Sequence, residues 1–520
     1  MFASCCGVSL LLLIIRSVYA NFLNCNTSSS DAFRPLFITF HCHCIATCYK
    51  CSTFAKKMDR SMSRNFSFFI DDDAGELVER YEKYLSGSAA GYFDVYEMER
   101  IVEYYLSHGR TKDSLTALEL GQKLHPTSSL LDVKRAKIYL ATGDINKAYR
   151  ILNHLIEDSS DPEVVFLKVE ALIKLERSQE AWELAKTLIH EEKDDLDWLC
   201  VDIGMLFMGE SEFDFALAVL KKGADFNPQN VDLLFDLAFC QEQKALFDDA
   251  FETYQRIIRI DSFVGEAWFN LGQIYFMRND FEKAIEAYDY ALVINEKDTI
   301  SLIQKAHSHF QLDHWKEALE DYLAYAETVS EKWQVWLFIA ECYEKLENFA
   351  RALFYYKLSY DEMPENYEAL IGISICLLEM EMFEEALDFI GKAMKVSDEM
   401  ADAWVYLAEA KVGLNKLDEA LEAYQQAISI DPNQPDTLVA MANIYMDAAD
   451  FQTALKYYQL AYSFDSTHEF IELFLAVANY YTGNYDDVAV YLELAVHRNF
   501  DAARMFLEMC PDAEKMLSKK

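Results

Sequence analysis

The sequence predicts an all-α superhelical solenoid of about twelve helix-turn-helix hairpins, with helical caps at its ends. The stretch from Gly265 to Asp298 contains two groups of large residues at helical spacing, separated by a short polar turn. Such a hairpin cannot bury its own apolar face, so it requires similar units on both sides. Small residues recur at intervals of 33 to 35 positions on both sides of it, which indicates that those units exist.

The recurring column of small residues passes through Ala284. Its members are Ser114, Ala148, Ala181, Ala216, Ala250, Ala284, Ala318, Ala352, Ala386, Ala420, Ala454 and Val488. A second column lies twelve residues earlier and is also mostly small, as in Ala136, Gly204, Ala238, Gly272, Ala306, Ala340, Ser374, Ala408, Ala442 and Ala476. Helices that cross at small residues approach to about 8 Å, so we expect close packing within each hairpin.

With Ala284 at position 20 of a 34-residue unit, the hairpin resembles the tetratricopeptide repeat. The residues that carry the resemblance are Trp268, Leu271, Gly272, Tyr275, Tyr288 and Ala291, at positions 4, 7, 8, 11, 24 and 27. The resemblance covers residues 95–502 in twelve units. The last unit departs from it with Val488 and Leu492, as expected where a stack of repeats ends.

Composition limits the classes of partner. The formal net charge of -40 disfavours nucleic acid and anionic membrane surfaces. Glycine and proline are scarce, 16 and 8 in 520 residues, and no long linker interrupts residues 95–502. We therefore expect one continuous array there, preceded by a capping helix and joint at 58–94 and followed by a capping tail at 503–520.

Residues 1–57 differ from the rest, with five basic residues, one acid and seven of the twelve cysteines. Three interpretations stay open. An apolar core at 8–15 followed by Val18-Tyr19-Ala20 fits an export signal. The cluster His41, Cys42, His43, Cys44, Cys48 and Cys51 fits a metal knuckle. The abrupt change in composition favours the third interpretation, that translation starts at Met58 or Met62 and the leader is not part of the mature protein.

The array carries isolated cysteines in apolar helical runs, at Cys200, Cys240, Cys342 and Cys376. Unpaired thiols suit a reducing interior. We therefore expect a cytoplasmic protein, with export through the leader as the alternative.

The sequence lacks the common catalytic and phosphate-binding motifs. It contains neither a glycine-rich phosphate loop, nor His-Glu-x-x-His, nor a nucleophile elbow. His307, His309 and His314 do not share a helix face, so we expect no metal site, and nothing indicates a cofactor. The sequence predicts a non-enzymatic scaffold for protein–protein interaction. The alternatives are an exported, envelope-associated assembly factor and a regulatory subunit of a separate enzyme.

The resemblance implies that positions 2, 5, 9, 12 and 13 of each first helix line a concave groove. Over twelve units these positions hold fifteen acids and three bases, Lys137, Lys174 and Lys345. The candidate partner-binding residues are Phe235, Phe239, Glu242, Glu266, Phe269, Gln273, Phe276, His307, Phe310, Glu341, Glu344, Glu368, Asp402, Glu409 and Asp436. An acidic groove with an aromatic stripe fits a basic amphipathic segment with apolar anchors. Two alternatives stay open: the acidic face is merely solvated, and some phenylalanines only seal adjacent repeats.

Tetratricopeptide grooves that hold a C-terminal carboxylate use lysine at position 5 and asparagine at position 9. Position 5 here is apolar through the body of the array, as in Phe269 and Ile303. We therefore expect no binding of acidic chaperone tails.

Overall fold

A computed structural model describes residues 74–88, 91–158, 161–397 and 399–513. Within these ranges the secondary structure comprises 26 α-helices and one 3-10 turn, which confirms the all-α prediction. The leader, its three interpretations and the tail beyond residue 513 lie outside the described residues. Contacts between Cα atoms divide the chain into two compact units, with the division between Ser301 and Leu302.

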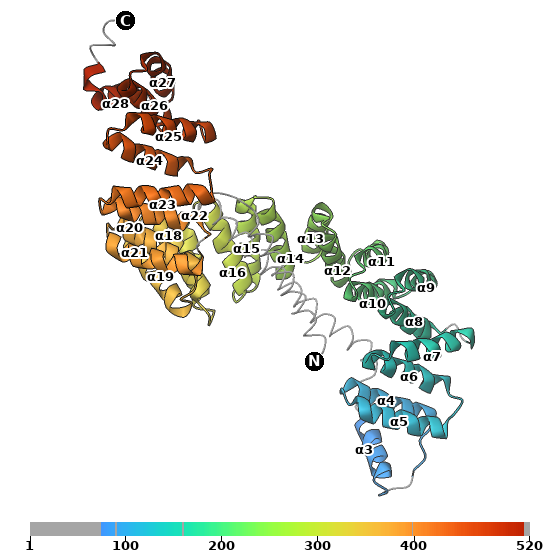
Figure 1. Cartoon of the computed structure of the whole chain (residues 1–520). Helices are drawn as coiled ribbons and strands as arrows, with labels where there is room; N and C mark the ends of the chain where they lie inside the picture. Colours follow the sequence, from blue (N-terminus) through green and yellow to red (C-terminus); the bar gives the residue numbers. More distant parts are fainter. Residues whose placement is uncertain (1–73, 89–90, 159–160, 398, 514–520) are drawn as a thin grey trace. The chain divides into compact units, whose positions relative to one another are not determined.

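The N-terminal unit contains α3 to α15, coloured blue to green in Figure 1. The helices are α3 (Ala74–Leu85), α4 (Val95–Ser107), α5 (Thr111–Leu124), α6 (Ser129–Thr142), α7 (Ile145–Asp158), α8 (Pro162–Lys174), α9 (Ser178–Glu191), α10 (Leu196–Gly209), α11 (Phe213–Phe226), α12 (Val231–Gln243), α13 (Phe247–Ile260), α14 (Gly265–Met277) and α15 (Phe281–Ile294).

The C-terminal unit contains most of α16 and all helices after it. The helices are α16 (Thr299–Gln311), α17 (Trp315–Ala326), α18 (Trp333–Lys345), α19 (Phe349–Glu362), α20 (Tyr367–Glu379), α21 (Phe383–Val396), α22 (Ala401–Gly413), α23 (Leu417–Ile430), α24 (Pro435–Asp447), α25 (Phe451–Phe464), α26 (Ile471–Thr482), α27 (Tyr485–Arg498) and α28 (Ala502–Met509), before the short turn η1 (Pro511–Ala513).

Successive helices pack as hairpins, α14 on α15 and α18 on α19 for example. The small-residue column predicted from the sequence lies at the centre of this packing. From Ser114 to Ala454 its members have no exposed surface, and Val488 is only 3% exposed. The second column of small residues is packed just as closely. At Gly272, for example, an added Cβ atom would lie 2.7 Å from the Tyr288 ring. Close helix crossing therefore explains why only small side chains occur there.

Every hairpin turns through a residue in the left-handed backbone region at position 15. The residues are Gly109, Gly143, Glu176, Ser211, Ala245, Asn279, Asp313, Glu347, Glu381, Asn415, Ala449 and Gly483. In the turn after α14, the Asp280 amide donates to the Tyr275 carbonyl at 3.0 Å, which holds this conformation. Most of these residues are not glycine, so the turn carries local strain.

Both ends of the described chain carry a covering helix. Helix α3 packs Leu77, Val78 and Tyr81 against the first hairpin. Helix α28 packs Ala502 and Phe506 against the last one. Each helix covers apolar surface that a neighbouring repeat would otherwise bury.

Cys200, Cys240, Cys342, Cys376 and Cys510 are buried and are not joined in disulfides. Burial raises the pKa of Cys200 to about 12, so this thiol stays protonated at neutral pH. None of the helices in the described ranges is long and apolar enough to cross a membrane.

Candidate partner-binding face

We call positions 2, 5, 9, 12 and 13 of the first helices the first-helix face. In the first three hairpins its acids are neutralised within the protein. Lys134 is 6% exposed, and its Nζ lies 3.0 Å from Glu99 Oε1 and 2.9 Å from Glu103 Oε2. Burial alone would lower the pKa of Lys134, but Glu103, Glu163 and Glu99 together raise it above its ordinary value. This lysine therefore remains charged inside the stack.

Two further lysines bind acids of the same face. Lys137 Nζ lies 2.5 Å from Glu163 Oε1, and Lys174 Nζ lies 2.7 Å from Glu170 Oε1. Burial would raise the pKa of Glu163, but Lys137 and Lys134 lower it below its usual range. The acids of these repeats thus belong to internal ion pairs.

In the C-terminal unit, tyrosine hydroxyls contact two acids of this face, and a histidine contacts a third. The Tyr356 hydroxyl donates to Glu344 Oε2 at 2.7 Å, and the Tyr367 hydroxyl donates to Asp402 Oδ1 at 2.5 Å. A hydroxyl donor orients a carboxylate without cancelling its charge. Asp436 Oδ1 lies 2.7 Å from His468 Nε2.

Glu409 is an acid of the face with a raised pKa, and Glu379 is its acidic neighbour. The Glu409 side chain still reaches solvent. Partial desolvation by nearby protein atoms and, to a lesser extent, the negative charge of Glu379 raise its pKa to about 7. A carboxyl group in this state is stabilised by an incoming cation.

Buried tyrosines at position 24 support the face from the second helices. Tyr322 contacts His307 Nδ1 at 2.6 Å, Tyr356 contacts Glu344, and Tyr458 contacts Asn443 Oδ1 at 2.5 Å. Burial raises the pKa of Tyr254 well above its usual value, and Glu242 raises it further. Sequence reasoning did not identify these supporting residues, although the regular spacing of the tyrosines was a usable signal.

The aromatic stripe is narrower than the sequence predicted. Phe269, Phe276 and Phe310 are between 1% and 7% exposed, because they pack on Tyr288, Phe281 and Trp315. Gln273 and His307 are also buried. Only Phe235 and Phe239 remain partly accessible. As a correction, the buried side chains of this set contribute to the core and present little surface to a partner.

The remaining candidates are acidic and keep access to solvent. Glu266 and Glu368 are exposed, and Glu242 and Glu341 are half-buried. The full candidate set divides between the units: Phe235, Phe239, Glu242, Glu266, Phe269, Gln273 and Phe276 lie in the N-terminal unit and the others in the C-terminal unit. Within the C-terminal unit, successive first helices α18, α20, α22 and α24 carry the acids.

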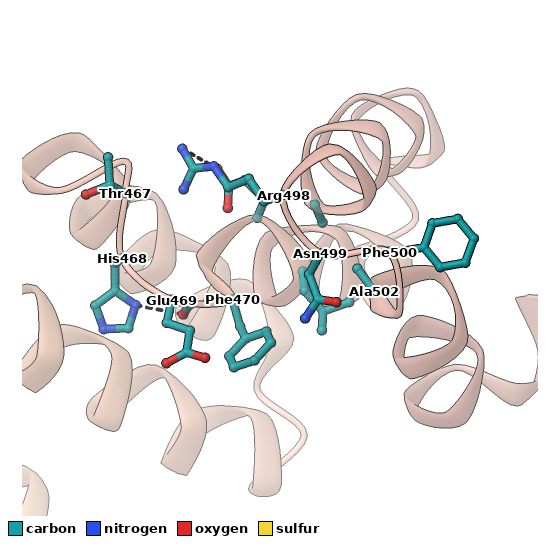
Figure 2. A pocket seen from close by; sticks show the side chains of 11 residues that line it. Thr467, His468, Glu469, Phe470, Arg498, Asn499, Phe500 and Ala502 are labelled. Atoms are coloured by element: carbon teal, nitrogen blue, oxygen red, sulfur yellow. Dashed lines mark hydrogen bonds and ion pairs between the residues drawn. The ribbon is translucent and has the colours of Figure 1, made fainter.

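A cavity of about 430 Å³ lies near the end of the C-terminal unit, between the loop before α26, the end of α27 and the start of α28 (Figure 2). Two of its charged lining residues, Glu472 and Arg498, form an ion pair. Glu472, 3% exposed at its side chain, accepts from Arg498 Nη2 at 3.0 Å, and His468 binds Asp436. This ion pair is a structural feature of the last hairpin.

The part of the chain that the structure describes contains no group of three or more His, Cys, Asp or Glu side chains placed to hold a metal ion.

Family models for the tetratricopeptide repeat match residues 265–298 and 303–367, and a TPR repeat model matches residues 392–448. Together with the twelve hairpins in register, these matches decide the family. The chain is a tetratricopeptide repeat (TPR) protein. TPR proteins generally act as scaffolds for protein–protein interaction, and their repeats usually lack catalytic activity.

Curated relatives match parts of this TPR protein. The general transcriptional corepressor trfA of Dictyostelium discoideum is 38% identical over 89 residues, which is 17% of this chain and 6% of the corepressor. The TPR repeat-containing protein MJ1428 of Methanocaldococcus jannaschii is 23% identical over 356 residues, 62% of each chain. The chain thus spans less than two thirds of either relative.

Among solved structures, the hetero-tetramer Cut9-Hcn1 of APC/C is similar at 16% identity. The match spans 74% of this chain and 96% of the matched chain in that structure, with a TM-score of 0.37.

Proposed function

We propose that this TPR protein is a non-enzymatic scaffold that binds a basic, amphipathic protein segment along the first-helix face of its C-terminal unit. The observation that carries the proposal is the pair Glu379 and Glu409. Partial desolvation and the neighbouring Glu379 carboxylate raise the pKa of Glu409 to about 7, so a lysine or arginine placed beside both carboxylates would relieve their repulsion.

The neighbouring acids support the same proposal because tyrosine hydroxyls hold them in place. Glu344 and Asp402 accept hydrogen bonds from Tyr356 and Tyr367, which fixes the carboxylates before a partner arrives. Preorganised charge lowers the entropy cost of binding.

Aliphatic side chains lie near the acidic pair on this face. Leu378, Val405 and Val412 lie at positions 12, 5 and 12 and remain partly accessible, close in sequence to Glu379 and Glu409. A segment that alternates basic and aliphatic side chains would fit this arrangement, since the anchors supply affinity and the charges supply specificity.

A synthetic amphipathic peptide of lysines and leucines tests the proposal by fluorescence anisotropy. We expect Glu379→Lys with Glu409→Lys to weaken binding at least about tenfold, because like charges face each other across an interface. The matched control is Glu320→Lys with Glu422→Lys, which changes net charge equally on exposed second helices. Equal effects from the two double variants would refute a specific face. Binding to the unaltered protein should also weaken with salt.

We infer a cytoplasmic setting for the scaffold. The described residues include five buried cysteines that form no disulfide, which supports a reducing compartment. The mass of the mature N-terminus from the native host tests this inference: removal of residues 1–20 would instead indicate export.

A further inference from the structure

We propose a second docking surface at the sixth hairpin of the N-terminal unit, made by Phe263 in the turn before α14 and by Trp268, Tyr290 and Val293 on the hairpin. It would take a protein segment that presents an apolar side chain beside lysine or arginine. We call these four residues the sixth-repeat patch. None of them lies at a first-helix face position, so this inference stands independently of the proposed function.

Three of the four residues are more than half exposed. Phe263 and Val293 are each 79% exposed, and Tyr290 is 54% exposed. The Trp268 ring stacks on Tyr290 with centroids 4.4 Å apart, and Trp268 Nε1 donates to the carbonyl of Ser262, the residue before Phe263, at 2.9 Å. Val293 lies three residues after Tyr290 on α15, hence on the same face of that helix.

Comparison with the other hairpins of the same chain shows that these two positions are apolar only here, at Phe263 before α14 and at Val293 on α15. Val293 occupies position 29, where the other eleven units have Lys123, Glu157, His190, Asp225, Arg259, Glu327, Asp361, Lys395, Ser429, Ser463 and His497. Phe263 occupies position 33, where the others have Thr127, Asp161, Asp194, Gln229, Lys297, Glu331, Glu365, Glu399, Asn433, Thr467 and Asp501.

Both positions are therefore solvent positions of this hairpin, filled by polar residues elsewhere. The hairpin folds without an apolar side chain at either place, so packing does not require Phe263 or Val293. Phe263 and Val293 thus replace polar residues at two solvent positions near an aromatic stack. This arrangement indicates a surface that contacts another molecule.

Charge beside the patch identifies the kind of partner. Glu286 lies four residues before Tyr290 on α15, and Glu282 lies one turn earlier, both exposed. Aromatic faces next to carboxylates favour lysine or arginine, through cation–π contact and ion pairing. A second copy of this chain fits poorly, because each copy carries a formal net charge of -40.

The test uses the full chain with Glu379→Lys and Glu409→Lys, so that the first-helix face is blocked and the patch is measured alone. The probe is a synthetic helical peptide of leucines and lysines that carries one photoreactive benzoylphenylalanine. We expect crosslinks to map within residues 262–294. Phe263→Gln with Val293→Ser, the residue types found at these positions in other repeats, should weaken binding at least about tenfold.

Phe354→Gln is the matched control, because Phe354 is 57% exposed but lies outside both surfaces. It should leave affinity unchanged, and circular dichroism should show all variants equally folded. The proposal is overturned if the Phe263 and Val293 substitutions leave affinity unchanged, or if crosslinks map elsewhere. It is also overturned if the protein sediments as a dimer that these substitutions dissociate, since a second copy would then be the occupant. The proposed function fails in a different experiment: it is wrong if Glu379→Lys with Glu409→Lys, without the patch substitutions, leaves peptide binding the same as in the unaltered protein.

Discussion

The first three hairpins and the C-terminal unit use the same fold but treat their acidic residues differently. Residues 95–191 contain 16 acids and 13 bases, and three lysines bind the acids of the first-helix face. Residues 302–513 contain 38 acids and 13 bases, and tyrosine hydroxyls hold Glu344 and Asp402.

This difference teaches that hairpin packing determines the small-residue columns and leaves the first-helix face free to vary. Ala148 and Ala420 are equally buried in the two regions. Lys137 and Glu409, both at position 9, serve opposite purposes: the first neutralises a neighbouring acid, and the second keeps an acidic pair available. The early repeats use charge for stability, and we propose that the later repeats use it for binding.

The largest effect is expected at Lys134. Lys134→Met leaves Glu99 and Glu103 without their buried cation, which should lower the free energy of unfolding by roughly 2 to 4 kcal/mol. Urea unfolding, with hydrogen exchange in α4 and α6, measures this loss. Lys411→Met is the control, because its partner Glu419 is 53% exposed and such pairs contribute about 0 to 1 kcal/mol. Similar losses in both variants would remove the distinction between the regions.

A second prediction concerns the packing that both regions share. Ala352→Leu should lower the free energy of unfolding by roughly 1 to 3 kcal/mol, because extra methylenes enter a fully buried helix crossing. Glu320→Leu on the exposed side of α17 should stay within about 0.5 kcal/mol. Thermal melts that ranked these variants in the opposite order would contradict the repeat register.

Replacing the left-handed turn residue by glycine should have the same effect in both regions. Ala245 and Ala449 have φ of 56° and 60°, a conformation that glycine adopts without strain. Ala245→Gly and Ala449→Gly should each raise the free energy of unfolding by about 0.5 kcal/mol, since relief of strain of about 1 kcal/mol exceeds the added entropy of the unfolded chain. Chemical denaturation measures the gain. A loss in either variant would show that the turn is not strained.

Much of the fold could be predicted because close helix crossings accept only small residues at fixed intervals. Ala284 and Gly272 therefore marked the hairpin in the sequence, and the structure confirms their burial. The strained turns were less visible, because Glu347 and Ala245 adopt the left-handed conformation without being glycine.

The candidate face was only partly predictable. The acids of this face can be predicted from their repeat positions alone. The exposure of an aromatic residue, by contrast, depends on which side chain of the next helix packs on it. Phe269 is covered by Tyr288 and His307 by Tyr322, contacts that appear only when two helices are packed together. The sixth-repeat patch was readable in principle, because Phe263 and Val293 stand out when the units are aligned by position.

Proton release on peptide binding tests most directly the claim that the C-terminal unit keeps its acids for a basic partner. Glu409 has a pKa of about 7 in the free protein, so it is partly protonated at neutral pH. A bound lysine would lower that pKa and expel the proton, and affinity for the lysine–leucine peptide should therefore rise with pH through this range. Calorimetry at pH 7 in buffers of different ionisation enthalpy should detect this release in the unaltered protein but not in Glu409→Gln. Binding without proton release, and with the same affinity in Glu409→Gln, would contradict the account.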